Sequence, residues 1–305
     1  MWRGVCVSER GNRANEDFAC VGDGYGVLLD GATGLAGDCL FPGEFQTNAQ
    51  WLSHRVGAML CASLGQGLGL PDALAVAASE ARDEFEAALG CPLDEADPDV
   101  VPSATLAVVT VRDGVVDVWG LGDSPTLVLL RDGRWLVGTD DALEAMDGRV
   151  VALATERLAA RRAAGDELAG RDRRGLVTDE LLTNRRLRNA TGGYWCLDPT
   201  GAALGHLRHL RVPVERVLLA GAMSDGLWRA FGLLSIARLD DLRQMGAADL
   251  RLLVDRMRCA EESDPDFERY GRLKLSDDAS AFLLGPSGSD EGATGSGSTS
   301  STPSA

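Results

Sequence analysis

The stretch TLAVVTVRDGVVDVWGLGDSPTLVLLRDGRWLV, residues 105–137, decides the fold class of this chain. It contains four apolar runs, rich in residues that favour strands, separated by short polar turns. Two of the turns read Arg-Asp-Gly, at 112–114 and 131–133, and Asp-Gly pairs between apolar runs are strong signals for β-hairpins. The third turn is Gly122-Asp123-Ser124. The stretch therefore predicts an antiparallel meander and argues against β-α-β units.

Shorter strands and pairs of helices surround this meander. Apolar patterning predicts further strands at 4–7, 18–21, 25–29, 214–220 and 281–284, and helices at 44–64, 71–89, 239–245 and 247–262. Pro71 suits the first turn of a helix, and Gly90 suits a helix end. Strand blocks separated by helical pairs predict an α+β domain, in which sheets pack on each other with helices outside.

The chain reads as one domain with two segments of different character. Residues 1–285 contain no linker and no repeat, whereas residues 286–305 are dominated by Gly, Ser and Thr, which predicts a disordered tail. Residues 141–190 are helical in pattern and rich in arginine. Two interpretations of 141–190 stay open: a solvated helical insertion, or a mobile flap that meets an acidic or phosphorylated partner.

The composition limits the classes of partner and compartment. The 305 residues are 45% hydrophobic and carry a formal net charge of −16, which argues against nucleic acid or an anionic membrane as a partner. No run approaches the roughly 20 apolar residues of a membrane helix, and a secretory signal is not expected. The seven cysteines are scattered, which argues against a disulfide framework or a thiolate zinc site and favours a reduced, cytoplasmic setting.

Short acidic motifs stand beside the predicted strands. They are Asn15-Glu16-Asp17, Asp30-Gly31, Ser224-Asp225-Gly226 and Ser276-Asp277-Asp278. Carboxylates so far apart in sequence converge only if their strands lie side by side, and converging carboxylates repel unless cations lie between them. The motifs therefore predict a site for hard divalent metal ions. The three histidines, His54, His206 and His209, are too dispersed for an imidazole-rich site.

Six motifs in order give the chain a resemblance to a known family over nearly all of residues 3–284. In this respect it resembles the metal-dependent serine/threonine protein phosphatases of the 2C type, particularly their bacterial members. The matching segments are Arg13-Ala14-Asn15-Glu16-Asp17, Leu29-Asp30-Gly31, Ser103-Ala104-Thr105-Leu106, Gly120-Leu121-Gly122-Asp123-Ser124, Ser224-Asp225-Gly226-Leu227 and Asp277-Asp278-Ala279-Ser280.

The resemblance implies a four-layer fold, a sandwich of two antiparallel sheets flanked on both sides by pairs of helices. It also implies a set of metal ligands. Asp30 would bridge two ions, with the Gly31 carbonyl on one of them and Asp225 and Asp277 on the other. Three further residues complete the set: Glu16 and Asp17 would serve one ion directly or through water, and Asp123 would help to hold a third, weaker ion. Such an oxygen-only shell suits Mg²⁺ or Mn²⁺.

The activity implied is hydrolysis of phosphoserine and phosphothreonine in proteins by a hydroxide that bridges the two cations. No side-chain nucleophile is needed in this scheme. Arg13 is the candidate for binding the phosphate through a bidentate hydrogen-bonded pair. It stands four residues before Asp17, where the family's arginine stands five before, and Arg10 is an alternative.

Two more departures from the family pattern affect the expected site. Asp30-Gly31 is followed by Ala32, so the histidine of eukaryotic members is missing, as it is in bacterial relatives, and a metal-bound water is the expected proton donor. Pro125 follows the Gly-Asp-Ser turn where an arginine is common. Two alternatives to a protein phosphatase stay open: a non-catalytic pseudophosphatase that binds a phosphorylated partner, and a phosphatase of small metabolites.

Overall fold

The computed structural model describes residues 1–11, 13–32 and 38–287, and these form a sandwich of two five-stranded sheets. All strand pairs in both sheets are antiparallel. In one sheet the order is β1 (Trp2–Glu9), β10 (Ala279–Pro286), β9 (Val217–Met223), β6 (Thr126–Leu130) and β7 (Trp135–Gly138). In the other it is β2 (Asp17–Gly22), β3 (Tyr25–Ala32), β4 (Ser103–Arg112), β5 (Val115–Leu121) and β8 (Arg208–Pro213).

The predicted strands of residues 105–137 are all present, but the prediction of one continuous meander is wrong. β4 and β5 form a hairpin in one sheet, whereas β6 and β7 form a hairpin in the other. The chain changes sheets at Gly122, which takes the left-handed φ of +81° and fits so closely that a Cβ there would lie 2.8 Å from the Thr105 side chain. β5 then pairs with β8, and β6 pairs with β9.

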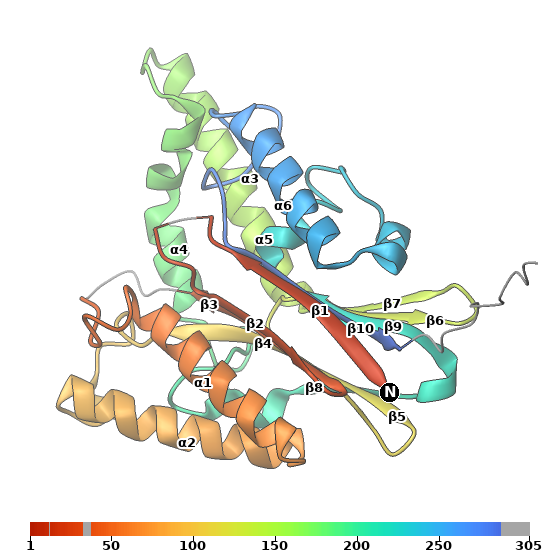
Figure 1. Ribbon diagram of the computed structural model, residues 1–305. Helices are drawn as coiled ribbons and strands as arrows, with labels where there is room; N and C mark the ends of the chain where they lie inside the picture. The colour runs from red at the N-terminus through yellow and green to blue at the C-terminus, as the bar shows by residue number, and fades with distance from the viewer. Residues whose placement is uncertain (12, 33–37, 288–305) are drawn as a thin grey trace, which may run out of the picture.

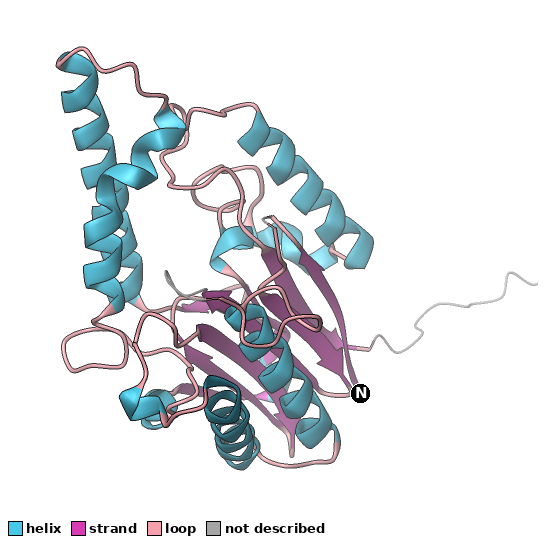
Figure 2. Ribbon diagram, turned by 90° about the vertical axis from the view of Figure 1, so that its left-hand side faces the viewer, coloured by secondary structure: helices cyan, strands magenta, loops and turns pink. Residues whose placement is uncertain are grey.

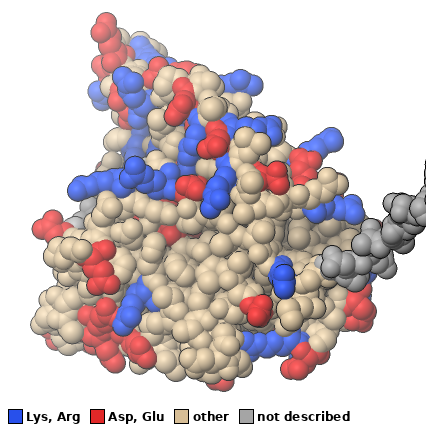
Figure 3. Space-filling model, in the orientation of Figure 1, with Lys and Arg blue, Asp and Glu red and all other residues tan. Residues whose placement is uncertain are grey.

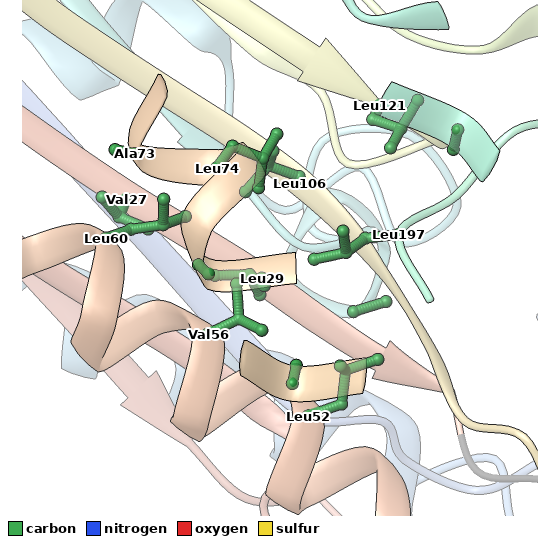
Figure 4. Close-up of a cluster of buried hydrophobic side chains, with 14 of the residues drawn as sticks. Val27, Leu29, Leu52, Val56, Leu60, Ala73, Leu74, Leu106, Leu121 and Leu197 are labelled. Carbon is green, nitrogen blue, oxygen red and sulfur yellow. The ribbon is translucent and has the colours of Figure 1, made fainter. Parts of the chain in front are cut away.

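One helical layer covers the outer face of the β2–β3–β4–β5–β8 sheet. It consists of α1 (Asn48–Gly65) and α2 (Leu70–Leu89), followed by the short η1 (Leu93–Glu95). The Thr47 hydroxyl caps α1 by accepting from the Gln50 N–H at 3.0 Å, and Gly90 ends α2 at a φ of +80°. Figure 4 shows leucine and valine side chains of α1 and α2 packed against those of β3 and β4.

Shorter helical segments cover the outer face of the other sheet. They are α5 (Asp225–Trp228), η5 (Leu239–Gln244) and α6 (Ala247–Glu262), and Figure 2 shows that the helices, in cyan, lie outside the strands, in magenta. The short η3 (Ala202–His206) and η4 (Val214–Arg216) flank β8 of the β2–β3–β4–β5–β8 sheet. Apolar side chains of α6 pack on β1 and β10, and a third core fills the space between the sheets around Leu28, Val109 and Phe282. These layers confirm the predicted α+β sandwich with helices outside.

The arginine-rich segment between β7 and β8 is helical, as predicted. It contains α3 (Asp141–Ala163), η2 (Gly170–Val177) and α4 (Thr178–Arg185), and it projects beyond the sandwich at the top of Figure 1. Arg157 of α3 binds Glu180 of α4 at 2.9 Å, and Arg162 binds Glu268 in the loop after α6 at 2.8 Å. Figure 3 shows charges of both signs gathered over this part of the molecule. Its predicted mobility stays a prediction.

Two predictions from the sequence concern the ends of the chain and its relation to membranes. None of the helices that the structure describes is both long and apolar enough to cross a bilayer. β10 ends at Pro286, and the Ser287 N–H donates to the Met1 carbonyl at 2.8 Å. The remainder of the predicted tail, from 288 to 305, lies outside the described residues.

The packing between the two sheets predicts the effect of one added methyl group. A Cβ at Gly26 of β3 would lie 2.3 Å from Cδ2 of Phe282, a ring that is fully buried. We expect Gly26→Ala to lower the free energy of unfolding by about 1–3 kcal/mol, as overpacking usually does. Urea unfolding measures this change.

Gly148→Ala in α3 is the matched control, because nothing lies within 4 Å of a Cβ at that position. There we expect no loss, and a gain of up to about 1 kcal/mol from helix propensity. An equal loss of stability in both variants would contradict the packing described between β3 and β10.

Candidate metal centre

Four of the predicted ligand positions lie at one end of the sandwich, where strands of both sheets begin or end. Asp17 starts β2 and stands directly opposite Asp30 in β3. Asp225 follows the end of β9, and Asp277 precedes the start of β10, the strand that pairs with β9. Antiparallel pairing therefore gathers side chains from the beginning, the end and the middle of the chain at one place.

The pKa values show that these carboxylates lie within electrostatic reach of one another. Burial, followed by the charges of Asp17, Asp225, Asp277 and Asp123, holds the pKa of Asp30 well above its ordinary value. Burial, followed by the charges of Asp278 and Asp277, raises the pKa of Asp17 to about 8. In the absence of bound cations, the folded protein thus favours the neutral acid at Asp17 and Asp30.

Asp17 is the most deeply buried of the predicted ligands, with 1% of its surface exposed. Its Oδ2 atom is buried and has no hydrogen-bond partner among the described residues. While Asp17 is ionised, a buried oxygen without a partner is costly. A cation bound there would supply the missing partner.

The first two acidic motifs are held against each other through backbone atoms. The Gly31 N–H donates to the Glu16 carbonyl at 3.1 Å, and a Cβ at position 31 would lie 2.6 Å from that same oxygen. Burial raises the pKa of Glu16, with the charge of Asp278 adding to the effect and a hydrogen bond from Thr47 opposing it. Because position 31 has no side chain, the backbone of Glu16 can lie directly against β3.

Asp278 has a role that the sequence analysis did not identify. Its two carboxylate oxygens accept from the backbone N–H groups of Gly11 and Glu16, each at 2.7 Å. The loop before β2 is thereby fixed to the start of β10. Asp278 is 5% exposed, so it is a buried link between the first and last motifs of the chain.

Asp123 lies at the turn where the chain passes from one sheet to the other. Its carbonyl accepts from the Thr139 hydroxyl at 3.2 Å. Burial, followed by the charges of Asp225, Asp147 and Asp140, raises its pKa well above the ordinary value. Asp140 caps α3 and Asp147 lies within α3, so the arginine-rich insertion contributes two carboxylates to the edge of the site.

Two cations balance the acidic cluster, and sequence reasoning missed both. Arg229 Nη2 lies 2.8 Å from Asp277 Oδ2, and Lys274 Nζ lies 2.5 Å from the same oxygen. Burial alone would raise the pKa of Asp225, but the charges of Arg229 and Lys274 hold it below its ordinary value. The available signal was composition: Lys274 is the only lysine in the chain.

A buried glutamate binds the two arginines that hold Asp277. Glu261, with none of its surface exposed, pairs with Arg258 at 2.9 Å and with Arg229 at 3.6 Å. Arg258 in turn donates to the Asp277 carbonyl at 2.5 Å. Both the side chain and the backbone of Asp277 are therefore held by arginines that share one acidic partner.

Arg13, the predicted phosphate ligand, is exposed at the edge of the loop before β2. Within the described part of the chain it forms no hydrogen bond or ion pair. The next residues shape the loop: the Asn15 side chain donates to the Ser8 hydroxyl at 2.9 Å and accepts from the Asp17 N–H at 3.2 Å. The roles of Arg13 and of each metal ligand stay predictions.

The donor chemistry of the cluster fits a hard divalent ion. All candidate donors are carboxylate or carbonyl oxygens, the ligands that hard divalent ions prefer. His54 lies beside Asp17, but its Nε2 is already hydrogen-bonded to the Asp17 carbonyl oxygen at 3.0 Å. Over residues 1–11, 13–32 and 38–287, no three Asp, Glu, His or Cys side chains already surround one point closely enough to hold an ion. The carboxylates are gathered at one end of the sandwich, but their side chains would have to move closer together to surround one ion.

The double acceptor role of Asp278 predicts a structural effect of its removal. We expect Asp278→Ala to lower the free energy of unfolding by about 2–4 kcal/mol, because two hydrogen bonds to a charged group are lost. Asp278→Asn keeps one acceptor oxygen and should lose about half as much. Urea unfolding measures the loss, and hydrogen exchange of the Gly11 and Glu16 amides locates it. Unchanged protection of both amides would contradict the link.

The raised pKa of Asp17 predicts how stability depends on pH without metal. Because the pKa rises from 3.8 to about 8 on folding, the folded state binds the proton more tightly. The contribution of Asp17 to stability is therefore fully present below about pH 4 and is lost as the pH rises through about 8. With a chelator present, we expect the urea midpoint to fall between about pH 5 and pH 8, and less steeply in Asp17→Asn.

Asp255→Asn on the exposed face of α6 is the control for this measurement, and it should keep the wild-type slope. A midpoint that rises with pH in the chelated wild-type protein would contradict the electrostatics described for the cluster.

Comparison with known proteins places this architecture among phosphatases. No family model matches the chain, and no curated protein matches its sequence. Among solved structures, the catalytic domain of the serine/threonine protein phosphatase PstP, in complex with 2 manganese ions, superposes with a TM-score of 0.51 at 18% identity, covering 93% of this chain and 97% of that one.

Two further bacterial structures give the same result. Stp1 from Staphylococcus aureus has a TM-score of 0.52 at 14% identity, covering 94% of this chain and 96% of that one. The serine/threonine phosphatase of S. agalactiae has a TM-score of 0.51 at 15% identity, covering 93% and 99%. The chain thus has the α+β sandwich fold of bacterial serine/threonine phosphatases, as the resemblance of its motifs led us to expect.

Proposed function

We propose that this protein is a metal-dependent phosphatase that hydrolyses phosphoserine and phosphothreonine in other proteins. The observation that carries the proposal is the position of Asp30, whose pKa responds to the charges of Asp17, Asp225, Asp277 and Asp123 at once. A buried cluster of this kind, in the fold of bacterial serine/threonine phosphatases, supports a catalytic metal centre.

The proposed ligands are those that the resemblance of the motifs implies. Asp30 would be a ligand of both ions, and the Gly31 carbonyl would join it on one of them, with Glu16 and Asp17 serving one ion directly or through water. Asp225 and Asp277 would hold the second ion, and Asp123 a third, weaker one. Mg²⁺ or Mn²⁺ suits this oxygen-only set, and the PstP structure contains 2 manganese ions.

The chemistry requires no nucleophilic side chain from the protein. Two bound cations supply the Lewis acidity that makes water a nucleophile near neutral pH and that offsets charge on the phosphoryl group. The protein's own contribution is to orient the substrate. Arg13, exposed beside the cluster, is proposed to bind the phosphate, with Arg10 as the alternative. The negative charge of several neighbouring carboxylates attracts a divalent cation more strongly than the sodium or potassium of the solvent.

The insertion is proposed to contact the protein substrate. Burial, with the charges of Arg188 and Arg174 adding to it, lowers the pKa of Arg185, so these three arginines lie near one another. The same region approaches the site through Asp147, whose pKa rises to about 6 through burial and the charge of Asp225. Arg188 is already engaged by the Val101 carbonyl at 2.9 Å and by Asp198 at 3.6 Å, so the exposed Arg174 is the member of the group that an acidic or phosphorylated partner would meet.

The cellular setting and the domain limits are part of the same proposal. All seven cysteines are free thiols, which supports a reducing compartment such as the cytoplasm. We place the phosphatase domain at residues 1–285 and assign it a role in signalling, opposite a protein kinase. The acidic net charge of −16 supports a protein partner in preference to nucleic acid or a membrane surface.

Hydrolysis of p-nitrophenyl phosphate and of a phosphothreonine peptide tests the proposal. We expect turnover of both with Mn²⁺, none with EDTA, and a loss of about 100-fold or more in Asp225→Asn. Asp255→Asn is the matched control, since it changes one exposed carboxylate of α6 to an amide and should keep full activity. Arg13→Ala should raise KM more than Arg10→Ala does.

The other outcomes separate the alternatives. Activity that survives both EDTA and Asp225→Asn would eliminate the metal mechanism. Stable Mn²⁺ binding without turnover of either substrate would identify a pseudophosphatase. Turnover of the small ester without the peptide would indicate an enzyme for small phosphorylated metabolites.

A further inference from the structure

We infer that Lys274 acts as a resident cation of the metal centre, holding Asp277 when no metal is present and giving up that carboxylate when a divalent ion binds. The inference rests on the metal-binding part of the proposed function. It assigns to this lysine a positioning role that lowers the affinity of the site for metal and stabilises the metal-free protein.

The first observation is where the ammonium group lies. Lys274 Nζ is 2.5 Å from Asp277 Oδ2, an oxygen that also receives Arg229 Nη2 at 2.8 Å. Two positive groups therefore converge on one carboxylate oxygen of a predicted metal ligand. A divalent ion that binds Asp277 must compete with them, since like charges at such distances repel strongly in a partly buried site.

The second observation is the composition of the chain. Lys274 is its only lysine, and all the other basic residues, out of 30 Lys and Arg, are arginine. Arginine has a planar fork that locks into carboxylates, whereas lysine carries a compact, strongly hydrated charge on a flexible stem. A lysine is the side chain that best replaces a small metal ion and can still leave.

The third observation separates Lys274 from Arg229. Arg229 is 15% exposed and is held from beneath by Glu261, a fully buried carboxylate at 3.6 Å. The Lys274 side chain is 40% exposed, and its only ion pair within the described residues is the one with Asp277. Lys274 can therefore swing into solvent and leave Asp277 still paired with Arg229, whereas movement of Arg229 would break its ion pairs with both Asp277 and Glu261.

The position of Lys274 in the chain allows this movement. It lies three residues before Asp277, in the loop that leads to β10, and neither it nor its neighbours Leu273 and Leu275 belong to a helix or strand. Asp277 itself stays fixed, because Arg258 holds its carbonyl and the adjacent Asp278 holds two backbone amides. The flexible partner in the pair is the lysine.

A single lysine makes the exchange directly observable. In protein labelled with ¹³C-lysine, one Cε signal reports on Lys274, and Mg²⁺ is a diamagnetic ion that leaves this signal sharp. We expect the signal to shift and to saturate with the same Mg²⁺ dependence that calorimetry gives for binding. A signal that stays in place while Mg²⁺ binds would overturn the inference and leave the proposed function intact.

Variants test the effect on affinity. By calorimetry we expect Lys274→Met to bind Mn²⁺ about tenfold more tightly than wild type, since one competing charge is gone. Its melting temperature in EDTA should fall, because Asp225 and Asp277 lose a counter-charge. Lys274→Arg should keep the positive charge and bind Mn²⁺ no more tightly than wild type. Weaker binding in Lys274→Met would show that the lysine merely supports Asp277 and would overturn the inference.

Arg134→Met is the matched control, because Arg134 pairs with Asp132 in the exposed turn between β6 and β7. It removes one positive charge from the same protein and should leave Mn²⁺ affinity unchanged within about twofold. If Lys274→Met fails to fold, Lys274→Gln and the wild-type ¹³C titration still decide the question. Absence of any Mg²⁺ or Mn²⁺ binding by the wild type would refute both this inference and the proposed function.

Discussion

Repulsion among carboxylates at one end of the sandwich is the constraint around which this molecule is organised. Asp17, Asp30, Asp123 and Asp277 all have raised pKa values in which burial is the largest cause and neighbouring acids add to it. A protein selected only for stability has little reason to bury several acids together. The surrounding structure compensates this repulsion in three distinct ways, each of which uses different residues.

Three kinds of group offset the negative charge of the cluster: backbone amides, two arginines and one lysine. Asp278 accepts two backbone N–H groups, so its charge is used to connect the first and last motifs. Arg229 and Arg258 hold Asp277 and are themselves held by the buried Glu261. Lys274 completes the balance from the surface. The arginines and Asp278 hold Asp277 and the loop before β2 in position, and the lysine is the cation that we propose gives way to a divalent ion.

The same cluster links the two parts of the chain that differ most in character. The sandwich supplies the strand ends, and the arginine-rich insertion supplies Asp140 and Asp147 at the edge of the site. In the insertion, the ion pair of Arg157 with Glu180 holds α3 to α4, and that of Arg162 with Glu268 holds α3 to the loop after α6. Other arginines of the insertion, such as Arg171, Arg174 and Arg186, stay exposed. These exposed arginines are the positive charge that the proposed contact with a phosphorylated protein would use.

The amino-acid sequence by itself determined the elements and the chemistry of this protein. Asp-Gly turns between apolar runs predicted the hairpins, Pro71 and Gly90 marked the limits of α2, and four acidic motifs indicated a centre of hard oxygen donors. These features are local, so short windows of sequence contain them. The order of six motifs gave the resemblance from which the layered fold was expected.

Tertiary structure alone decided how those elements are paired and how the acidic centre is balanced. The chain passes from one sheet to the other at Gly122 because β5 pairs with β8 and β6 pairs with β9. Both partner strands are distant in sequence. The roles of Arg229, Glu261 and Lys274 depend likewise on contacts across the fold, because a charge is compensated by what lies near it in space. No local pattern distinguishes those residues from ordinary surface charges.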